Sequence, residues 1–112
     1  MSARGETWLW LIQRASAAVL ALCVLVHLIT MIFAVRGGLS AAEILSRTHG
    51  SVAWATFYAV FVVAAALHTP IGLRIVLTEW LSWRGRSLDL AMLVFGLLLA
   101  VLGIRAIAGV VS

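Results

Sequence analysis

Residues 15–35 read ASAAVLALCVLVHLITMIFAV, a run without a formally charged side chain. The hydrocarbon core of a bilayer is about 30 Å thick and takes about 20 helical residues per crossing. Two further runs of this length follow at residues 50–73 and 90–111, the last interrupted only by Arg105. Because a backbone in lipid must pair its own polar groups, and no strand-like alternation is present, we predict an all-α fold of three transmembrane helices. The expected helices cover about residues 8–35, 51–77 and 89–111.

The composition of the chain excludes most soluble functions. Of its 112 residues, 64% are apolar and 11% are charged, whereas about a quarter of the residues in a soluble domain are charged. Three spans use nearly the whole chain, so we predict a single membrane-anchor domain, residues 1–112, without a separate catalytic domain. The formal net charge of +4 comes from arginines that flank the apolar runs and contact lipid headgroups, so no nucleic-acid partner is expected.

The distribution of arginine predicts the orientation in the membrane. Arginines on the side of the N-terminus and the second connection are Arg4, Arg14, Arg74, Arg84 and Arg86, and those on the other side are Arg36, Arg47 and Arg105. Because positive charge is retained in the cytoplasm, we predict a multi-pass protein with a cytoplasmic N-terminus. An aromatic belt on the same side is expected from Trp8, Trp10, Trp80 and Trp83. Basic residues that are all arginine, without an arginine-rich transit peptide, favour a bacterial inner membrane over a mitochondrial one.

Ionisable side chains inside a span are functional candidates, and the first of them is His68. Ala64 lies one helical turn before it and Gly72 one turn after it, on the same face. An imidazole between two small residues is the slot that a haem needs, with an axial nitrogen ligand and room for the porphyrin plane. The alternative is a close-packing face of small residues, in which His68 bonds to a neighbouring helix. Pro70 is expected to kink the helix beside this position.

His27 is the second intramembrane candidate. With Ser16, Cys23 and Thr30 it forms a weakly polar stripe at helical spacing, which should face protein rather than lipid. From spacing alone, an interhelical hydrogen bond is favoured over a ligand role for His27. His49 adjoins the first connection and is interpreted as an interfacial residue without an assigned role.

Other polar residues lie at the cytoplasmic ends of the expected spans. Arg14 can extend toward lipid headgroups, unless an acidic group such as a haem propionate lies nearby. Glu79 and Trp80 follow the second span, where topology and belt anchoring also explain them. The sequence has no nucleophile motif, phosphate loop or metal-binding cysteine pair, so the chain alone is not expected to be an enzyme. The lack of a mid-span carboxylate argues against a proton-coupled transporter.

Residues of the second span carry a resemblance to a known family. The segment 68–74, HTPIGLR, with Glu79 five positions further, resembles the H-x-x-x-G-[IL]-R-x-x-x-x-[DE] segment of the membrane-anchor cytochrome b subunits of succinate dehydrogenase and fumarate reductase, respiratory complex II. The segment 77–80, LTEW, is similar to the L-T-D-Y of one anchor type. The segment 14–16, RAS, resembles the R-x-S of the other type. Length, three spans and a cytoplasmic N-terminus also match, so the resemblance covers essentially the whole chain.

The resemblance implies roles for individual residues. It implies that His68 is an axial ligand of haem b, whose second ligand comes from a second membrane-anchor chain. It places Arg14 near the haem propionates and the quinone, with Ser16 close by. It also implies that ubiquinone or menaquinone binds at the cytoplasmic side against the iron–sulfur subunit, where Glu79 and Trp80 match the acidic and tyrosine positions of the family.

Some residues depart from the family pattern, and one suggests a second haem. Trp80 offers an indole N–H where the family has the phenol of a tyrosine. Gln13 and Trp10 stand where one anchor type has a histidine and a quinone-binding serine. The quinone contacts are therefore arranged differently or come from the partner. Two-haem members of the family carry histidines in the first and second helices about forty residues apart. His27 and His68 have this spacing, so the resemblance raises His27 as a ligand of a second haem iron toward the outer leaflet.

The function implied by the resemblance is that of a haem b-containing membrane anchor of a succinate:quinone oxidoreductase or fumarate reductase. Such an anchor docks the flavoprotein and iron–sulfur subunits and forms the quinone site, whereas the flavin chemistry belongs to another subunit. The second anchor chain is a paralogue or a second copy, and the spans lie in membrane lipid. Two alternatives stay open: a haem-free structural anchor and, less favoured, a small solute transporter.

Overall fold

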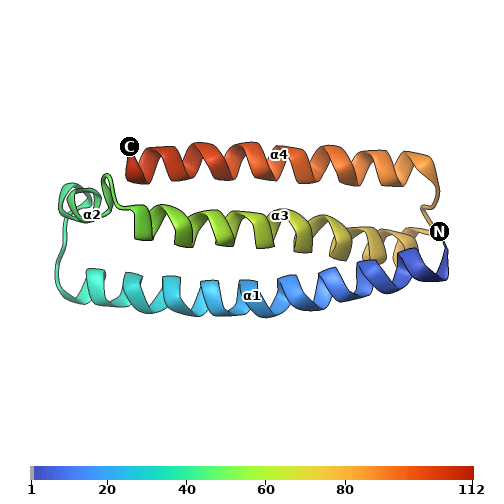
Figure 1. Cartoon of the computed structure of the whole chain (residues 1–112), viewed down its shortest axis with the longest axis horizontal. Helices are drawn as coiled ribbons and strands as arrows, with labels where there is room; N and C mark the ends of the chain where they lie inside the picture. Colours follow the sequence, from blue (N-terminus) through green and yellow to red (C-terminus); the bar gives the residue numbers. More distant parts are fainter. Residues whose placement is uncertain (1) are drawn as a thin grey trace.

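The computed structural model describes residues 2–112. Within these residues it contains α-helices and no strand; the helices are α1 (Ala3–Arg36), α2 (Ala41–Thr48), α3 (Val52–Leu81) and α4 (Arg86–Val111). The helices α1, α3 and α4 are each long and apolar enough to cross a membrane, so the predicted all-α fold with three spans is confirmed. Figure 1 shows these three helices side by side, with α3 between α1 and α4.

The first helix begins before its apolar run. Ser2 caps α1 by accepting a hydrogen bond from the backbone N–H of Gly5, so the helix starts at Ala3 rather than near residue 8. The additional turn carries polar residues, among them Glu6, whose carboxylate suits the positive end of the helix dipole. Hydropathy marks only the part of a helix that lies in lipid, and the cap determines where the helix actually begins.

The central helix also extends beyond its apolar run. α3 continues to Leu81, and Ser82 then adopts the left-handed conformation that ends a helix, with φ of 55°. Glu79 and Trp80 are therefore helical residues, whereas the expected helix stopped near residue 77.

The first connection contains a short helix that hydropathy did not predict. The helix α2 starts with a capping box, in which the side chains of Ser40 and Glu43 each accept a hydrogen bond from the backbone N–H of the other. At its other end the buried Thr48 donates a 2.7 Å hydrogen bond to the backbone carbonyl of Val110 in α4. The Thr48 hydrogen bond holds α2 against the C-terminal end of α4.

Small residues and a proline set the contact between α3 and α4. A Cβ atom added to Gly103 of α4 would lie 2.5 Å from a methyl carbon of Val62, so the two helices approach closely at this point. A Cβ added to Gly96 would lie 3.2 Å from the ring of Pro70, which is buried in the same contact. The helix α3 is assigned as one continuous helix through Pro70.

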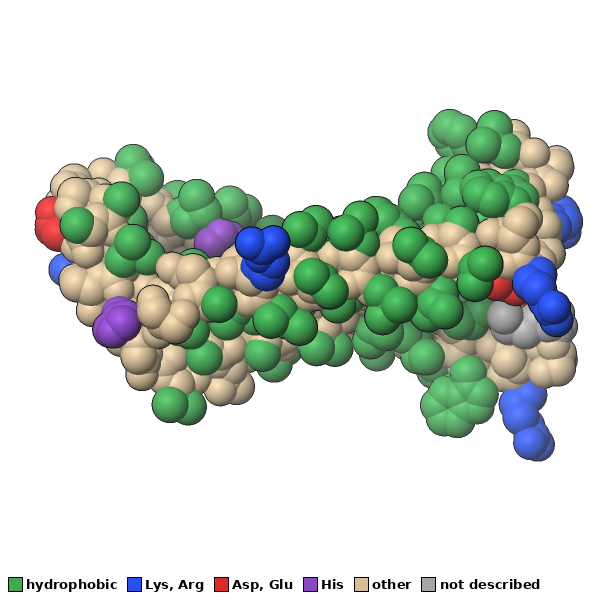
Figure 2. All heavy atoms as spheres, turned by 90° about the horizontal axis from the view of Figure 1, so that it is seen from above, with side chains coloured by type: hydrophobic (Ala, Val, Ile, Leu, Met, Phe, Trp, Pro, Cys, Tyr) green, Lys and Arg blue, Asp and Glu red, His purple; other side chains and the backbone are tan. Residues whose placement is uncertain are grey.

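Most large apolar side chains of the three long helices face outward. Leu22 of α1, for example, is 66% exposed, and Leu97 of α4 is 59% exposed. Figure 2 shows apolar side chains over the middle of the molecule and most charged side chains toward its two ends. An apolar surface of this extent is stable in contact with lipid chains or with another protein, so the chain is a multi-pass membrane protein.

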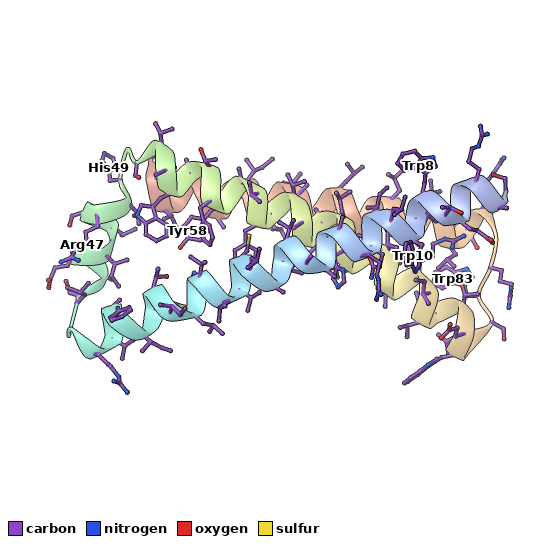
Figure 3. The ribbon with its side chains drawn as sticks, turned by 60° about the horizontal axis from the view of Figure 1, so that its bottom comes forward. Trp8, Trp10, Arg47, His49, Tyr58 and Trp83 are labelled. Atoms are coloured by element: carbon purple, nitrogen blue, oxygen red, sulfur yellow. The ribbon has the colours of Figure 1, made fainter. Side chains whose placement is uncertain are left out.

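The two ends of the helix layer carry different groups. The N-terminus and the connection from α3 to α4 lie at one end, whereas α2 and the C-terminus lie at the other (Figure 1). Trp8, Trp10 and Trp83 lie toward the first end (Figure 3), in agreement with the aromatic belt that the sequence predicts. At this end Arg74 of α3 and Asp89 of α4 form an ion pair of 2.9 Å, which the sequence analysis did not predict.

Candidate functional site

His68 has an unusual environment in α3. Its side chain is half-buried, and its Nδ1 atom is fully enclosed without a hydrogen-bond partner. Among residues 2–112, the only other enclosed side-chain nitrogen or oxygen without a partner is Oε1 of Gln13. Because enclosed polar atoms in native proteins nearly always have partners, the unpaired Nδ1 distinguishes His68 from the other histidines of residues 2–112.

The His68 ring lies beside a shallow groove of about 470 Å³, which we call the His68 groove. Its other lining residues all belong to α1: Ala17, Leu20, Ala21, Val24, Leu25 and Leu28. Ala17 and Ala21 are one helical turn apart, so they leave a low surface next to the ring. The groove is apolar and has walls from α1 and α3 only, so its open side faces lipid or a second protein chain.

The slot expected on α3 itself is closed in the structure. Ala64 is only 4% exposed, because it lies where α3 meets α1. A Cβ on Gly72 would lie 3.0 Å from Nε2 of Gln13, so the Gln13 side chain of α1 covers this glycine. Ala64 and Gly72 therefore lie at the contact between α3 and α1, and a role of Gly72 beside a haem stays a prediction. The small residues that leave room beside His68 come from α1 instead.

The residues around His68 fit an axial haem ligand. Haem coordination requires a free imidazole nitrogen, small neighbours for the porphyrin plane and apolar surroundings, and the His68 groove provides all three. Since Nδ1 is the enclosed nitrogen, Nε2 is the atom available to an iron. An axial histidine usually donates its other N–H to an acceptor, which the described part of this chain does not supply. A groove open on one side suits a cofactor that is shared with a second chain.

Ser16 does not share the His68 groove. Ser16 is 6% exposed and donates a 3.1 Å hydrogen bond to the backbone carbonyl of Gln13. It lines a second groove, of about 510 Å³, which we call the Ser16 groove and which has walls from α1 and α3. Neighbouring lining residues are Ile12, Ala15, Val19, Ala59, Val60 and Val63. At 100° per residue, the α1 residues of the two grooves lie on different faces of the helix.

Among the other predicted quinone residues, Glu79 and Trp80 lie toward the end of the molecule that carries the N-terminus, and Arg14 lies about one helical turn before Ala17 of the His68 groove. Arg14 is exposed, and its guanidinium carbon lies 5.5 Å from the centre of the Trp10 ring, within the range of a cation–π contact. Glu79 is exposed, and Trp80 is 80% exposed. Eleven residues separate Glu79 from His68, which corresponds to about 16 Å along α3. Glu79 and Trp80 therefore lie nearer the end of the molecule than His68 does.

His27 has partners within its own chain. Its Nδ1 atom lies 3.4 Å from the hydroxyl of Tyr58, and the rings of Tyr58 and Phe61 contact it edge-on with centroid separations of 5.8 Å. Figure 3 shows Tyr58 between α1 and α3, near α2. His27 therefore takes part in an interhelical contact, as the favoured explanation from spacing expects, and it lines a different cavity from His68. The contact with Tyr58 does not test whether His27 also binds a second haem, so that role stays a prediction.

Within residues 2–112, no cluster of ligand side chains supports metal binding by this chain alone. No group of three or more histidine, cysteine, aspartate or glutamate side chains is close enough to hold an ion in this part of the chain. Cys23 is buried, and His49 is an exposed residue at the end of α2. Any metal at His68 therefore needs a carrier such as a porphyrin and a ligand from elsewhere.

Comparison with known proteins adds evidence that is independent of this geometry. A family model described as succinate dehydrogenase/fumarate reductase transmembrane subunit matches residues 1–108. This match includes α1, α2, α3, most of α4 and every candidate residue described above. No curated protein and no solved structure has a significant match to the chain.

Proposed function

The chain belongs to the family of succinate dehydrogenase/fumarate reductase transmembrane subunits, and on this premise we propose that it is a haem b-containing membrane anchor of a succinate:quinone oxidoreductase or fumarate reductase. In this role it docks the flavoprotein and iron–sulfur subunits at its cytoplasmic end and takes part in the quinone site. The observation that carries the proposal is the half-buried His68 beside an apolar groove that opens sideways, with Nδ1 enclosed and Nε2 left available.

His68 is the residue that would hold the haem. Nε2 of His68 would coordinate the haem iron, and a histidine of a second anchor chain would supply a further ligand across the His68 groove. Ala17 and Ala21 leave room for the porphyrin, and the leucines of the groove exclude water. A bis-histidine haem supplies one-electron transfer in a dry surrounding that sets its potential.

The quinone site is assigned to the cytoplasmic rim. Arg14 and Trp80 carry exposed N–H donors at this end, which suit the carbonyl oxygens of ubiquinone or menaquinone. Glu79 is an exposed carboxylate at the same end, where protons arrive from water. Ser16 is close in sequence to Arg14 but lies in the Ser16 groove, so a contact of Ser16 with the quinone requires approach from that groove.

The proposal also states in which membrane the chain lies and which subunit carries out the redox chemistry. The chain carries no catalytic residues of its own, and the oxidation of succinate or reduction of fumarate belongs to the flavin of another subunit. The excess of arginine near the N-terminus and the second connection supports a cytoplasmic position for this end. A bacterial inner membrane is the proposed location.

Substitution of Ala21 by tryptophan tests the position of the haem. The indole would fill the His68 groove, so we expect Ala21→Trp to lower the haem b content of the purified complex several-fold. The tagged chain is purified from its native membrane, haem b is measured by its absorbance, and the flavoprotein and iron–sulfur subunits are identified by mass spectrometry. The wild-type chain is expected to bring both subunits with it.

The matched control is Val60→Trp, which introduces the same side chain into the Ser16 groove. Haem should be retained in this variant. Equal haem in the Ala21 variant and the wild type, or equal loss in both variants, would contradict the assignment of the haem to the His68 groove. Purification of the wild-type chain without the two soluble subunits would contradict the anchor function.

A further inference from the structure

A cavity at the end of the molecule away from the proposed quinone site is separate from the His68 groove and from the residues assigned to the quinone. It has a volume of about 500 Å³ and lies among α1, α2 and α3, and we call it the outer cavity. Its polar lining residues are His27, Thr30, Arg47, Thr48 and Tyr58. Its apolar lining residues are Met31, Phe33, Ala34, Leu39, Ile44 and Trp54. The cavity therefore combines a long apolar wall with a few polar groups.

Arg47 is the charged group of the outer cavity, and its charge is not neutralised within the described chain. Glu43 lies one turn earlier on α2, but its carboxylate accepts the backbone N–H of Ser40 as part of the capping box. Among residues 2–112, the side-chain ion pair is the one between Arg74 and Asp89, at the other end of the molecule. Arg47 is also exposed, so its guanidinium is accessible to a ligand from the membrane surface.

The other polar groups of the cavity leave its charge positive. Thr30 donates its hydroxyl hydrogen to the backbone carbonyl of His27 at 2.8 Å, and Thr48 donates its own to α4. The Tyr58 hydroxyl faces Nδ1 of His27 at 3.4 Å. A ligand with an anionic head that accepts hydrogen bonds and an apolar body matches this arrangement, because a guanidinium binds phosphate oxygens through several N–H groups.

We propose that the outer cavity binds one anionic phospholipid, with its phosphate on Arg47 and an acyl chain along the apolar wall. The position of the cavity favours this occupant. Arg36 ends the apolar run of α1, and Arg47 lies on α2 in the connection just beyond it, which is the level of lipid headgroups. The helix α2 is amphipathic, with apolar Leu45 on the face opposite Glu43 and Arg47, as helices at a membrane interface are. A bilayer also supplies such a lipid at high local concentration.

Arg47→Gln is the variant that tests this site. Charge-assisted hydrogen bonds contribute about 1.5–3 kcal/mol, so their loss should weaken binding roughly tenfold or more. The purified complex is depleted of lipid in detergent and titrated with phosphatidylglycerol or with phosphatidylcholine of the same acyl chains, and bound lipid is counted by native mass spectrometry. Wild type is expected to prefer phosphatidylglycerol, and Arg47→Gln is expected to lose this preference.

Two further variants make the result specific. Arg36→Gln removes the same charge at the same end of the chain from a residue that does not line the cavity, so it should bind lipid as the wild type does. Ala34→Trp fills the cavity and should weaken binding of both lipids. The proposal is overturned if Arg47→Gln keeps the preference, if Arg36→Gln loses it equally, or if the molecule extracted from the wild-type cavity is a quinone or a porphyrin. None of these results depends on haem at His68.

Discussion

Replacement of His68 by alanine is expected to remove the b-type absorbance of the assembled complex almost completely. His68 is the half-buried histidine beside a lipid-facing groove, and no other described histidine shares that groove. Its Nδ1 atom has no hydrogen-bond partner in the chain, so truncation of the ring leaves no polar group of α1 or α3 newly unpaired. Insertion into the membrane should therefore persist. Reduced-minus-oxidised spectra of purified membranes measure the effect.

The matched control for this prediction is His49→Ala. His49 is an exposed residue at the end of α2, so its loss should leave the spectrum unchanged. The amount of anchor chain in the membrane, measured by immunoblot, separates loss of haem from loss of protein. A full spectrum in the His68 variant at normal protein level would remove the ligand assignment and leave a haem-free anchor as the better description.

The second large effect is expected for Gly103→Leu, which should separate α4 from α3. A Cβ at residue 103 would lie 2.5 Å and 2.7 Å from the two methyl carbons of Val62, and leucine adds three more carbon atoms beyond it. Overpacking of a closed contact costs about 1–3 kcal/mol, and the Val62 side chain leaves no space for leucine at residue 103. We expect a clearly lower temperature of thermal unfolding for the purified complex in detergent.

A control substitution is available on the same helix. A Cβ at Gly109 of α4 would meet nothing within 4 Å, so Gly109→Leu should unfold close to the wild-type temperature. The same unfolding temperature for both variants would mean that α4 does not approach α3 at Gly103 as described. The double variant Gly103→Leu with Val62→Ala should recover part of the lost stability, because it removes the methyl groups that clash.

The fold could be predicted from the sequence because hydropathy is a local property. Each span consists of consecutive apolar residues, so residues 15–35 indicate a helix without knowledge of their neighbours. The helix α2 was missed because eight residues are too short for such an average, although Ser40 and Glu43 have the spacing of a capping box. That spacing was the signal that could have identified α2.

The neighbours of the candidate residues could not be predicted in the same way. His68 was identified by its position inside a span, but its small neighbours were expected at Ala64 and Gly72 of the same helix. The structure places both in the contact with α1 and supplies Ala17 and Ala21 of α1 instead. Which face of α3 meets α1 depends on packing between segments about fifty residues apart, and one sequence does not encode this in a local pattern.

Ion pairs and polar contacts between helices also depend on packing between distant segments, so the sequence did not predict them. Tyr58 as the neighbour of His27, and Asp89 as the partner of Arg74, both come from a different helix than the residue they contact. Their residue types were visible in the sequence, but the register between the helices was not. The layer formed by α1, α3 and α4 also leaves the His68 groove open, which is consistent with a subunit that is completed by another chain.

The most direct measurement of the central claim is a pyridine haemochrome assay on the affinity-purified membrane complex, with haem counted per copy of this chain. We expect haem b in the complex, at one haem for each pair of anchor chains joined across the His68 groove. Two haems per pair would add His27 as a ligand. A complex that contains the soluble subunits and no haem b would contradict the account.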